Sequence, residues 1–184
     1  MNGRFWLTLM LIAVALCWSA QAIEERHGIL VGEIVKVDDA TKTVAVKTAD
    51  GTEHTLYFVK ETAVHGAQAA TTGSAEAFHG LKEGSHIAVH YTAKGTEETA
   101  HEIDDIGKDG LKSTDATVVH IDRAAKTLAV KTADGTEETY HLTDRAAIDA
   151  GKDIREGAES SVKVTIYYTE EAGHKVAHFF QRAI

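Results

Sequence analysis

The chain has 184 residues and a formal net charge of −9 at pH 7, with 28 acidic and 19 basic side chains. This acidity argues against nucleic acids and anionic membrane surfaces as partners, because both select for patches of Lys and Arg. The single cysteine excludes a disulfide framework, so the fold must depend on its apolar core.

Residues 1–22 are typical of a secretory signal peptide. Arg4 supplies a positive charge, an apolar stretch follows it, and Ala20-Gln21-Ala22 provides a cleavage site. The apolar stretch is shorter than the roughly 20 residues that span a bilayer. We therefore expect a periplasmic or secreted protein with no membrane span after cleavage. The alternatives are an uncleaved N-terminal anchor and a lipoprotein modified at Cys17.

One segment of the sequence occurs twice. Residues 35–53 read VKVDDATKTVAVKTADGTE, and residues 119–137 read VHIDRAAKTLAVKTADGTE. Weaker similarity follows in the same order, from 81–84 to 154–157, from 87–92 to 164–169 and from 100–103 to 177–180. This arrangement predicts a domain duplication. We expect a first domain at residues 23–107, a linker around Gly107-Lys108-Asp109-Gly110, and a second domain at residues 111–184.

Each domain has the period of two that is typical of strands with one buried face. In the first domain, Val44, Val46 and Thr48 alternate with residues that point the other way. Asp50-Gly51 and Asp134-Gly135 follow the second strand of each domain and favour the type I′ turn of a two-residue hairpin. The fourth and fifth strands are expected at residues 86–93 and 98–106, with counterparts at 163–170 and 174–184.

Five strands in about 75–85 residues indicate an all-β protein made of two tandem five-stranded OB-like small barrels. A short helical or irregular insert is expected between the third and fourth strands, at residues 66–80 in the first domain and 146–157 in the second. A meander folded into a small sandwich is the alternative. Since a unit of this size is marginally stable alone, we expect the two barrels to pack against each other.

These motifs resemble a known family. A strand ending in Val-x-Val-Asp, followed by Lys-Thr-Val-x-Val and Asp-Gly, is similar to the DUF5666 domains of exported bacterial proteins. Thr62-Ala63-Val64, the run Leu81-Lys82-Glu83-Gly84 before Ile87-Ala88-Val89, and Ala100-x-x-Ile103 fit the same pattern. The resemblance covers nearly all of both domains. It implies a small exported β-barrel, and it brings no known activity or catalytic residue with it.

The sequence contains no convergent set of catalytic residues. Residues 23–184 have no Cys, no Gly-x-Ser-x-Gly turn and no phosphate-binding loop. Adjacent acids such as Asp38-Asp39 and Asp104-Asp105 point to opposite faces of a strand, so we interpret these pairs as solvated groups. We predict that the protein is not an enzyme, with a hydrolase as the weaker alternative.

The eleven histidines, all within residues 23–184, are the unusual feature of the composition. Imidazole suits Zn²⁺, Cu(II) and Ni²⁺, whereas Cu(I) prefers Cys and Met, which these residues lack. His86 and His90 are four residues apart, about 13 Å along a strand, so a shared ion needs a ligand from a neighbouring strand. We hypothesise a metal site at His86, His90 and His101, with no other cofactor.

His101 and His178 are the histidines that occupy equivalent places in the two domains. Each lies on the last strand, in phase with an apolar residue, Ile103 or Phe180. This pattern favours half-buried strand histidines that pack at the end of a barrel.

The leader, the duplication and the lack of a catalytic set predict a non-catalytic exported binding or structural module of the bacterial cell envelope. Its partner would be a protein, peptide or glycan of unknown identity. The alternative is a periplasmic protein that binds Zn²⁺, Cu(II) or Ni²⁺ through its histidines.

Overall fold

A computed structural model of the chain describes residues 24–66, 75–154 and 162–182. Over these residues the protein forms two closed five-stranded barrels, which confirms the predicted all-β class and OB-like architecture. The alternative of a small sandwich is wrong, because each sheet closes on itself. The predicted leader, residues 1–22, lies outside the described residues.

The first barrel is formed by β1 (Glu25–Asp38), β2 (Thr43–Thr48), β3 (Glu53–His65), β4 (His86–Lys94) and β5 (Glu97–Asp105), with the short helix α1 (Ala75–Gly80) between β3 and β4. Neighbouring strands follow the order β1-β2-β3-β5-β4, and β4 pairs with β1 to close the barrel. The pair β3–β5 is parallel and the other pairs are antiparallel.

The second barrel is formed by β6 (Lys112–Asp122), β7 (Thr127–Thr132), β8 (Glu137–Leu142), β9 (Lys163–Glu171) and β10 (His174–Arg182), with helix α2 (Asp144–Asp153) between β8 and β9. Its strand order, β6-β7-β8-β10-β9, is equivalent to that of the first barrel. The predicted helical insert is therefore present in both barrels. Within the described ranges, neither helix is long and apolar enough to cross a membrane.

The alternating apolar side chains of the strands fill the inside of each barrel. The fully buried members include Ile34, Val46, Leu56, Ile87 and Ile103 in the first barrel, and Val118, Val130, Tyr140, Val164 and Ile166 in the second. The inserts add Phe78 to the first core and Ala146 and Ala150 to the second. Each barrel thus has its own apolar core.

The hairpins after β2 and β7 form where the sequence predicts them, but their turn type differs from the prediction. The N–H of Gly51 donates to the carbonyl of Thr48 at 2.9 Å, and Gly51 has φ +87° while Asp50 has no positive φ. A type I′ turn needs positive φ at both central residues, so this loop is instead a three-residue turn that ends in glycine. The Asp50 carboxylate stabilises it by accepting the N–H of Thr52 at 2.9 Å.

β-bulges lie at matching positions in the two barrels. In the β4–β5 pair the register skips His101, because His90 pairs with Glu102 while Tyr91 pairs with Ala100. In the β9–β10 pair the register skips His178 in the same way. Since a bulge redirects the side chain of the extra residue, both histidines leave the regular alternation of their strands.

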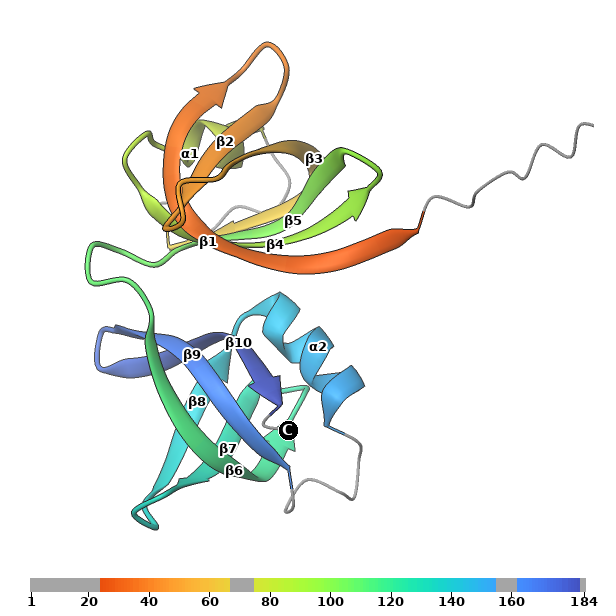
Figure 1. Ribbon diagram of the computed structural model, residues 1–184. Coiled ribbons are helices and arrows are strands. Elements are labelled where there is room, and N and C mark those ends of the chain that lie inside the picture. The colour runs from red at the N-terminus through yellow and green to blue at the C-terminus, as the bar shows by residue number, and fades with distance from the viewer. Residues whose placement is uncertain (1–23, 67–74, 155–161, 183–184) are drawn as a thin grey trace, which may run out of the picture.

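The two barrels pack against each other, with β4 and β5 of the first facing α2 and β10 of the second (Figure 1). Three of the hydrogen bonds between described residues cross from one barrel to the other. Nε2 of His90 donates to the carbonyl of His178 at 2.9 Å. The other two join Arg145 to Glu102 and His178 to Asp104. The junction is therefore polar and includes buried acids and histidines.

Candidate metal centre

The last strand of the first barrel carries two buried acids. In β5, Ile103 belongs to the barrel core, so its neighbours Glu102 and Asp104 lie on the opposite, outward face. Both acids are nevertheless buried, with 1% and 0% of their surface exposed. The reason is that the second barrel covers this part of β5.

His65, the last residue of β3, reaches the same place. β3 runs parallel to β5, and their register pairs His65 with Asp104. Nε2 of His65 lies 3.3 Å from Oε2 of Glu102. One ligand atom from each of the three residues lies within 4.8 Å of the others. Among the described residues, this is the one group of three or more His, Cys, Asp or Glu side chains with such spacing.

The same three residues carry unsatisfied polar atoms. In the described part of the chain, the buried side-chain atoms without a hydrogen-bond partner are Nε2 of His65, Oε1 of Glu102 and Oδ1 of Asp104. The 3.3 Å contact of His65 lies outside hydrogen-bond geometry. Leaving such a group unsatisfied costs about 1–3 kcal/mol, and more when it is charged. Each residue of the cluster therefore has one buried ligand atom that lacks a hydrogen bond.

The other oxygen of each carboxylate is held by the second barrel. Oε2 of Glu102 accepts the backbone N–H of Arg145, in the first turn of α2, at 3.0 Å. Oδ2 of Asp104 lies 2.9 Å from Nδ1 of His178, which donates because an ionised carboxylate only accepts. These bonds fix the orientation of both acids.

Burial and neighbouring charges shift the protonation of the cluster. The Glu102 carboxylate raises the pKa of His65 against the opposing effect of burial. Burial disfavours ionised Glu102, but His65, Thr143 and the N–H of Arg145 outweigh it and lower the pKa of Glu102. Burial raises the pKa of Asp104; the bond from His178 opposes this shift, and the charge of Glu102 adds to it. Two acids this close disfavour a second negative charge unless a cation is present.

The residues fit a metal ion. Imidazole nitrogen and carboxylate oxygen both bind Zn²⁺, at about 2.0–2.2 Å. Two ligands of one ion are then at most about 4.4 Å apart. The ligand atoms of the cluster lie within 4.8 Å of one another, close to that limit.

The structure places the three histidines of the sequence hypothesis in different surroundings. Nε2 of His86 lies 4.0 Å from a carboxylate oxygen of Glu33 on the surface. His90 is buried between the barrels, where it donates to the carbonyl of His178. Nε2 of His101 lies 2.9 Å from Oγ1 of Thr92. None of the three belongs to the close group of ligand atoms found among the described residues.

Sequence reasoning did not identify His65, Glu102 or Asp104. The interpretation of Asp104 as a solvated group is wrong, because the second barrel buries it. One signal was available: Glu102 and Asp104 flank Ile103, and acids two positions apart on a strand share a face. The position of His65 depends on the register of β3 with β5, which no local pattern predicts.

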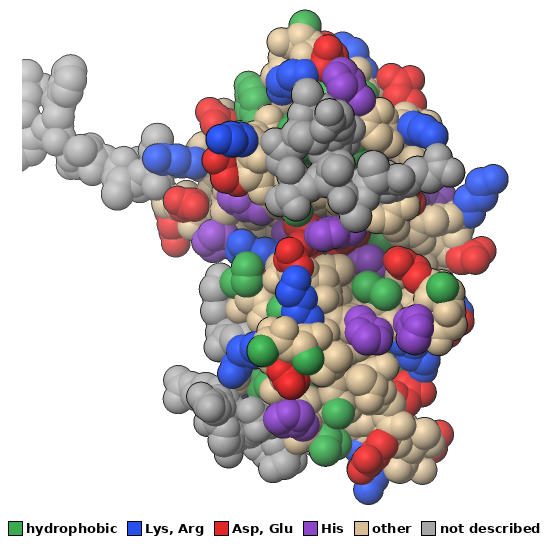
Figure 2. Space-filling view, turned by 180° about the vertical axis from the view of Figure 1, so that it is seen from behind, with side chains coloured by type: hydrophobic (Ala, Val, Ile, Leu, Met, Phe, Trp, Pro, Cys, Tyr) green, Lys and Arg blue, Asp and Glu red, His purple; other side chains and the backbone are tan. Residues whose placement is uncertain are grey.

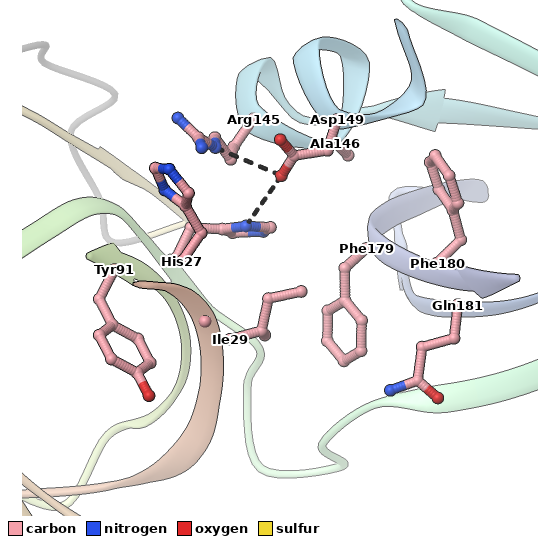
Figure 3. A pocket seen from close by; sticks show the side chains of 11 residues that line it. His27, Ile29, Tyr91, Arg145, Ala146, Asp149, Phe179, Phe180 and Gln181 are labelled. Atoms are coloured by element: carbon pink, nitrogen blue, oxygen red, sulfur yellow. Dashed lines mark hydrogen bonds and ion pairs between the residues drawn. The ribbon is translucent and has the colours of Figure 1, made fainter. Parts of the chain in front are cut away.

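Histidine side chains gather along the junction of the two barrels on the face shown in Figure 2. A cleft of about 440 Å³ opens between the two barrels and is lined by both, including Tyr91 of β4 and Phe179 of β10. His65, Glu102 and Asp104 do not line it. At one end of it, Nε of Arg145 donates to Asp149 at 3.3 Å, and His90 lies 3.6 Å from the same carboxylate (Figure 3). Clefts of this size are large enough for a small molecule.

Comparisons with known proteins identify no family. No protein-family model matches the chain, and neither does any curated protein. Among solved structures, the silver-bound protein Ag(I)CusF is similar at 12% identity and a TM-score of 0.31, over 42% of this chain and 95% of that one. The tetrameric p202 HIN2 domain is similar at 9% identity and a TM-score of 0.28, over 88% of this chain and 96% of that one. Similarities this weak carry no argument about function.

Proposed function

We propose that this chain is an exported, non-catalytic metal-binding protein that holds one divalent ion of the Zn²⁺ class at His65, Glu102 and Asp104. The observation that carries the proposal is a coincidence of two independent properties. Among the described residues, the three whose ligand atoms approach within 4.8 Å of one another are also the three that carry unsatisfied buried side-chain atoms. An ion bound between them would supply the missing partner for all three.

Electrostatics supports a cation at this place. The cluster brings two carboxylates close together in a buried site, where their mutual repulsion is weakly screened. Protonation of His65 supplies one compensating charge at most, whereas a divalent ion supplies two. Binding of the ion would also relieve the burial cost that raises the pKa of Asp104.

The ligand types narrow the choice of ion. One nitrogen and two oxygens suit Zn²⁺ and related borderline ions, and Cu(I) would require the Cys or Met that residues 23–184 lack. Structural zinc sites use four protein ligands, whereas three leave a position for water. A three-ligand set therefore leaves one coordination position of the ion open.

Export and the lack of catalysis are further parts of the proposal, and they rest on the leader at residues 1–22 and on the missing catalytic set. A metal-binding protein is one form of the broader hypothesis of an envelope binding module. A peptide or glycan ligand remains compatible with it, and the cleft at Tyr91 and Phe179 is the place where we would look for one.

The test is a Zn²⁺ titration of residues 23–184, followed by calorimetry and native mass spectrometry at neutral pH. The protein is purified without a histidine tag, because added imidazoles would bind the ion. We expect one tightly bound ion per chain. Asp104→Asn keeps the shape of the side chain but removes an anionic ligand, and it should abolish this binding.

The matched control is Asp105→Asn, which removes the same charge from the next residue. Asp105 lies outside the cluster, where its carboxylate accepts the N–H of Gly107 at 2.9 Å. The control should therefore bind one ion as the unchanged protein does. The proposal is wrong if the unchanged protein takes up no stoichiometric ion, or if both variants bind alike.

A further inference from the structure

In each of the two carboxylates of the cluster, one oxygen is hydrogen-bonded to the second barrel and the other is not. Oε2 of Glu102 and Oδ2 of Asp104 bond to the second barrel, at 3.0 Å and 2.9 Å. Oε1 of Glu102 and Oδ1 of Asp104 are buried and have no hydrogen-bond partner among the described residues. Each acid is thus oriented by the second barrel through one oxygen and leaves the other oxygen available.

His178, the partner of Asp104, is itself held on several sides. It lies in the bulge of β10 and is 2% exposed. Its Nε2 lies 2.9 Å from Oγ1 of Thr169, and its carbonyl accepts a hydrogen bond from His90 of the first barrel. The ring therefore presents its Nδ1–H to Asp104 from a fixed position.

His101 in the first barrel is the counterpart of His178 in the second. His101 lies in the equivalent bulge of β5, and its Nε2 lies 2.9 Å from Oγ1 of Thr92. The histidine–threonine pair is therefore present in both barrels with the same 2.9 Å spacing. What distinguishes His178 is the contact of its other nitrogen with Asp104. The histidine–threonine pair belongs to the structure that both barrels share, whereas the contact with Asp104 is made by His178 and not by His101.

We infer that His178 is a positioning residue for the metal ion, and that the second barrel forms the outer shell of a site whose ligands all come from the first. This inference rests on the proposed metal-binding function. His178 does not bind the ion; it holds Asp104 in the orientation that directs Oδ1 to the ion. Outer-shell hydrogen bonds of this kind change metal affinity by about 10–100-fold.

The experiment compares two replacements of His178 in residues 23–184 by Zn²⁺ calorimetry. His178→Leu removes the donor to Asp104, and we expect binding to weaken by about 10–100-fold. His178→Asn places a side-chain N–H near the position of Nδ1, and it should restore most of the affinity. His101→Leu is the matched control, because it removes the equivalent histidine without touching the cluster, and its affinity should equal that of the unchanged protein.

A second readout separates positioning from general loss of structure. Co²⁺ replaces Zn²⁺, and its visible absorption bands report the geometry of the ligands. We expect these bands to change in His178→Leu and to be retained in His178→Asn and His101→Leu. Thermal unfolding of each variant shows that it is folded at the temperature of the titration.

The outcomes distinguish the two proposals. If the unchanged protein binds Zn²⁺ and folded His178→Leu binds it equally well, the role of His178 is wrong while the metal site stands. If both His178 variants lose affinity equally, the residue acts through the fold and the inference is also wrong. If the unchanged protein binds no ion, the proposed function fails first and the inference fails with it.

Discussion

Asp104 combines a buried position with a charge that its surroundings only partly compensate. Burial raises the pKa of this group above the ordinary value near 3.8, despite the bond from His178. For an acid whose pKa is raised in the folded state, the stability contributed by the uncharged, protonated form is fully present below the pKa of the same group in the unfolded chain. It is lost as the pH rises through the pKa of the folded protein. At neutral pH, ionised Asp104 therefore costs stability in the ion-free protein.

Asp104→Asn should make the ion-free protein more stable at neutral pH. The amide removes the buried charge and its repulsion by Glu102, while its oxygen still accepts the bond from His178. We expect the Tm to rise by ~2–4 °C, the change that 1 kcal/mol produces in a chain of this size. The measurement is thermal unfolding with chelator at neutral pH and again at a pH below the ordinary pKa of aspartate, where the advantage should shrink. A fall in Tm at neutral pH would show that the His178–Asp104 bond outweighs the cost of burial.

The two barrels differ in the element that follows their third strand. β3 continues alongside β5 as far as His65, whereas β8 ends at Leu142 and is followed at once by α2. The extension of β3 supplies a ligand to the cluster, and the N-terminus of α2 supplies the N–H that holds Glu102. The cluster therefore depends on a difference between the two barrels and has no equivalent among the described residues of the second.

Thr143→Ala should weaken both α2 and the cluster. Thr143 is the N-cap of α2, and its hydroxyl oxygen accepts the N–H of Ala146 at 3.3 Å. Loss of such a cap costs about 1 kcal/mol. Thr143 also lowers the pKa of Glu102, so ion binding should weaken as well. Urea unfolding and Zn²⁺ titration measure the two effects, and Thr143→Ser, which keeps the hydroxyl, should show neither. An unchanged urea midpoint in Thr143→Ala would contradict the capping role.

At the scale of the whole molecule, the cluster joins two units that each have their own core. The ligands come from the first barrel, and the groups that orient them come from the second. An ion that binds only when the barrels are docked must stabilise the docked arrangement by the same free energy. The junction is thus the part of the molecule where ion binding and tertiary structure are coupled.

Cutting the linker should leave the barrels associated when Zn²⁺ is bound. A protease site placed between Gly107 and Gly110, where Lys108 and Asp109 are exposed, allows cleavage after the whole chain has folded. At an ion concentration 100 times the Kd, binding of the ion stabilises the docked arrangement of the barrels by about 2.7 kcal/mol. In dilute solution we expect the halves to elute together in Zn²⁺ and to separate more readily in chelator. In cleaved Asp104→Asn the ion should make no difference, and the same insensitivity in the unchanged sequence would contradict the coupling.

Much of the fold follows from local patterns. The alternation around Val44 and Val46 and its copy in the second domain predict strands with one buried face, and both strands are present as β2 and β7. The glycine of each Asp-Gly pair predicts a hairpin, which forms although its turn type differs. The metal site predicted at His86, His90 and His101 follows from the number of histidines in the chain, but the sequence does not give the register of the strands that carry them. This site remains a prediction.

By itself, the sequence determined that Ile103 lies inside a barrel and that Glu102 and Asp104 lie outside it, because side chains alternate along a strand. Only the tertiary structure decided what the outer face of β5 meets. A face that would be solvated in a single barrel is buried here by β10 and α2, and the parallel pairing of β3 with β5 brings His65 to it. Burial and proximity depend on residues far apart in the chain, so no local periodicity encodes them. For that reason an ordinary pair of surface acids becomes a candidate metal site only after the two barrels have docked.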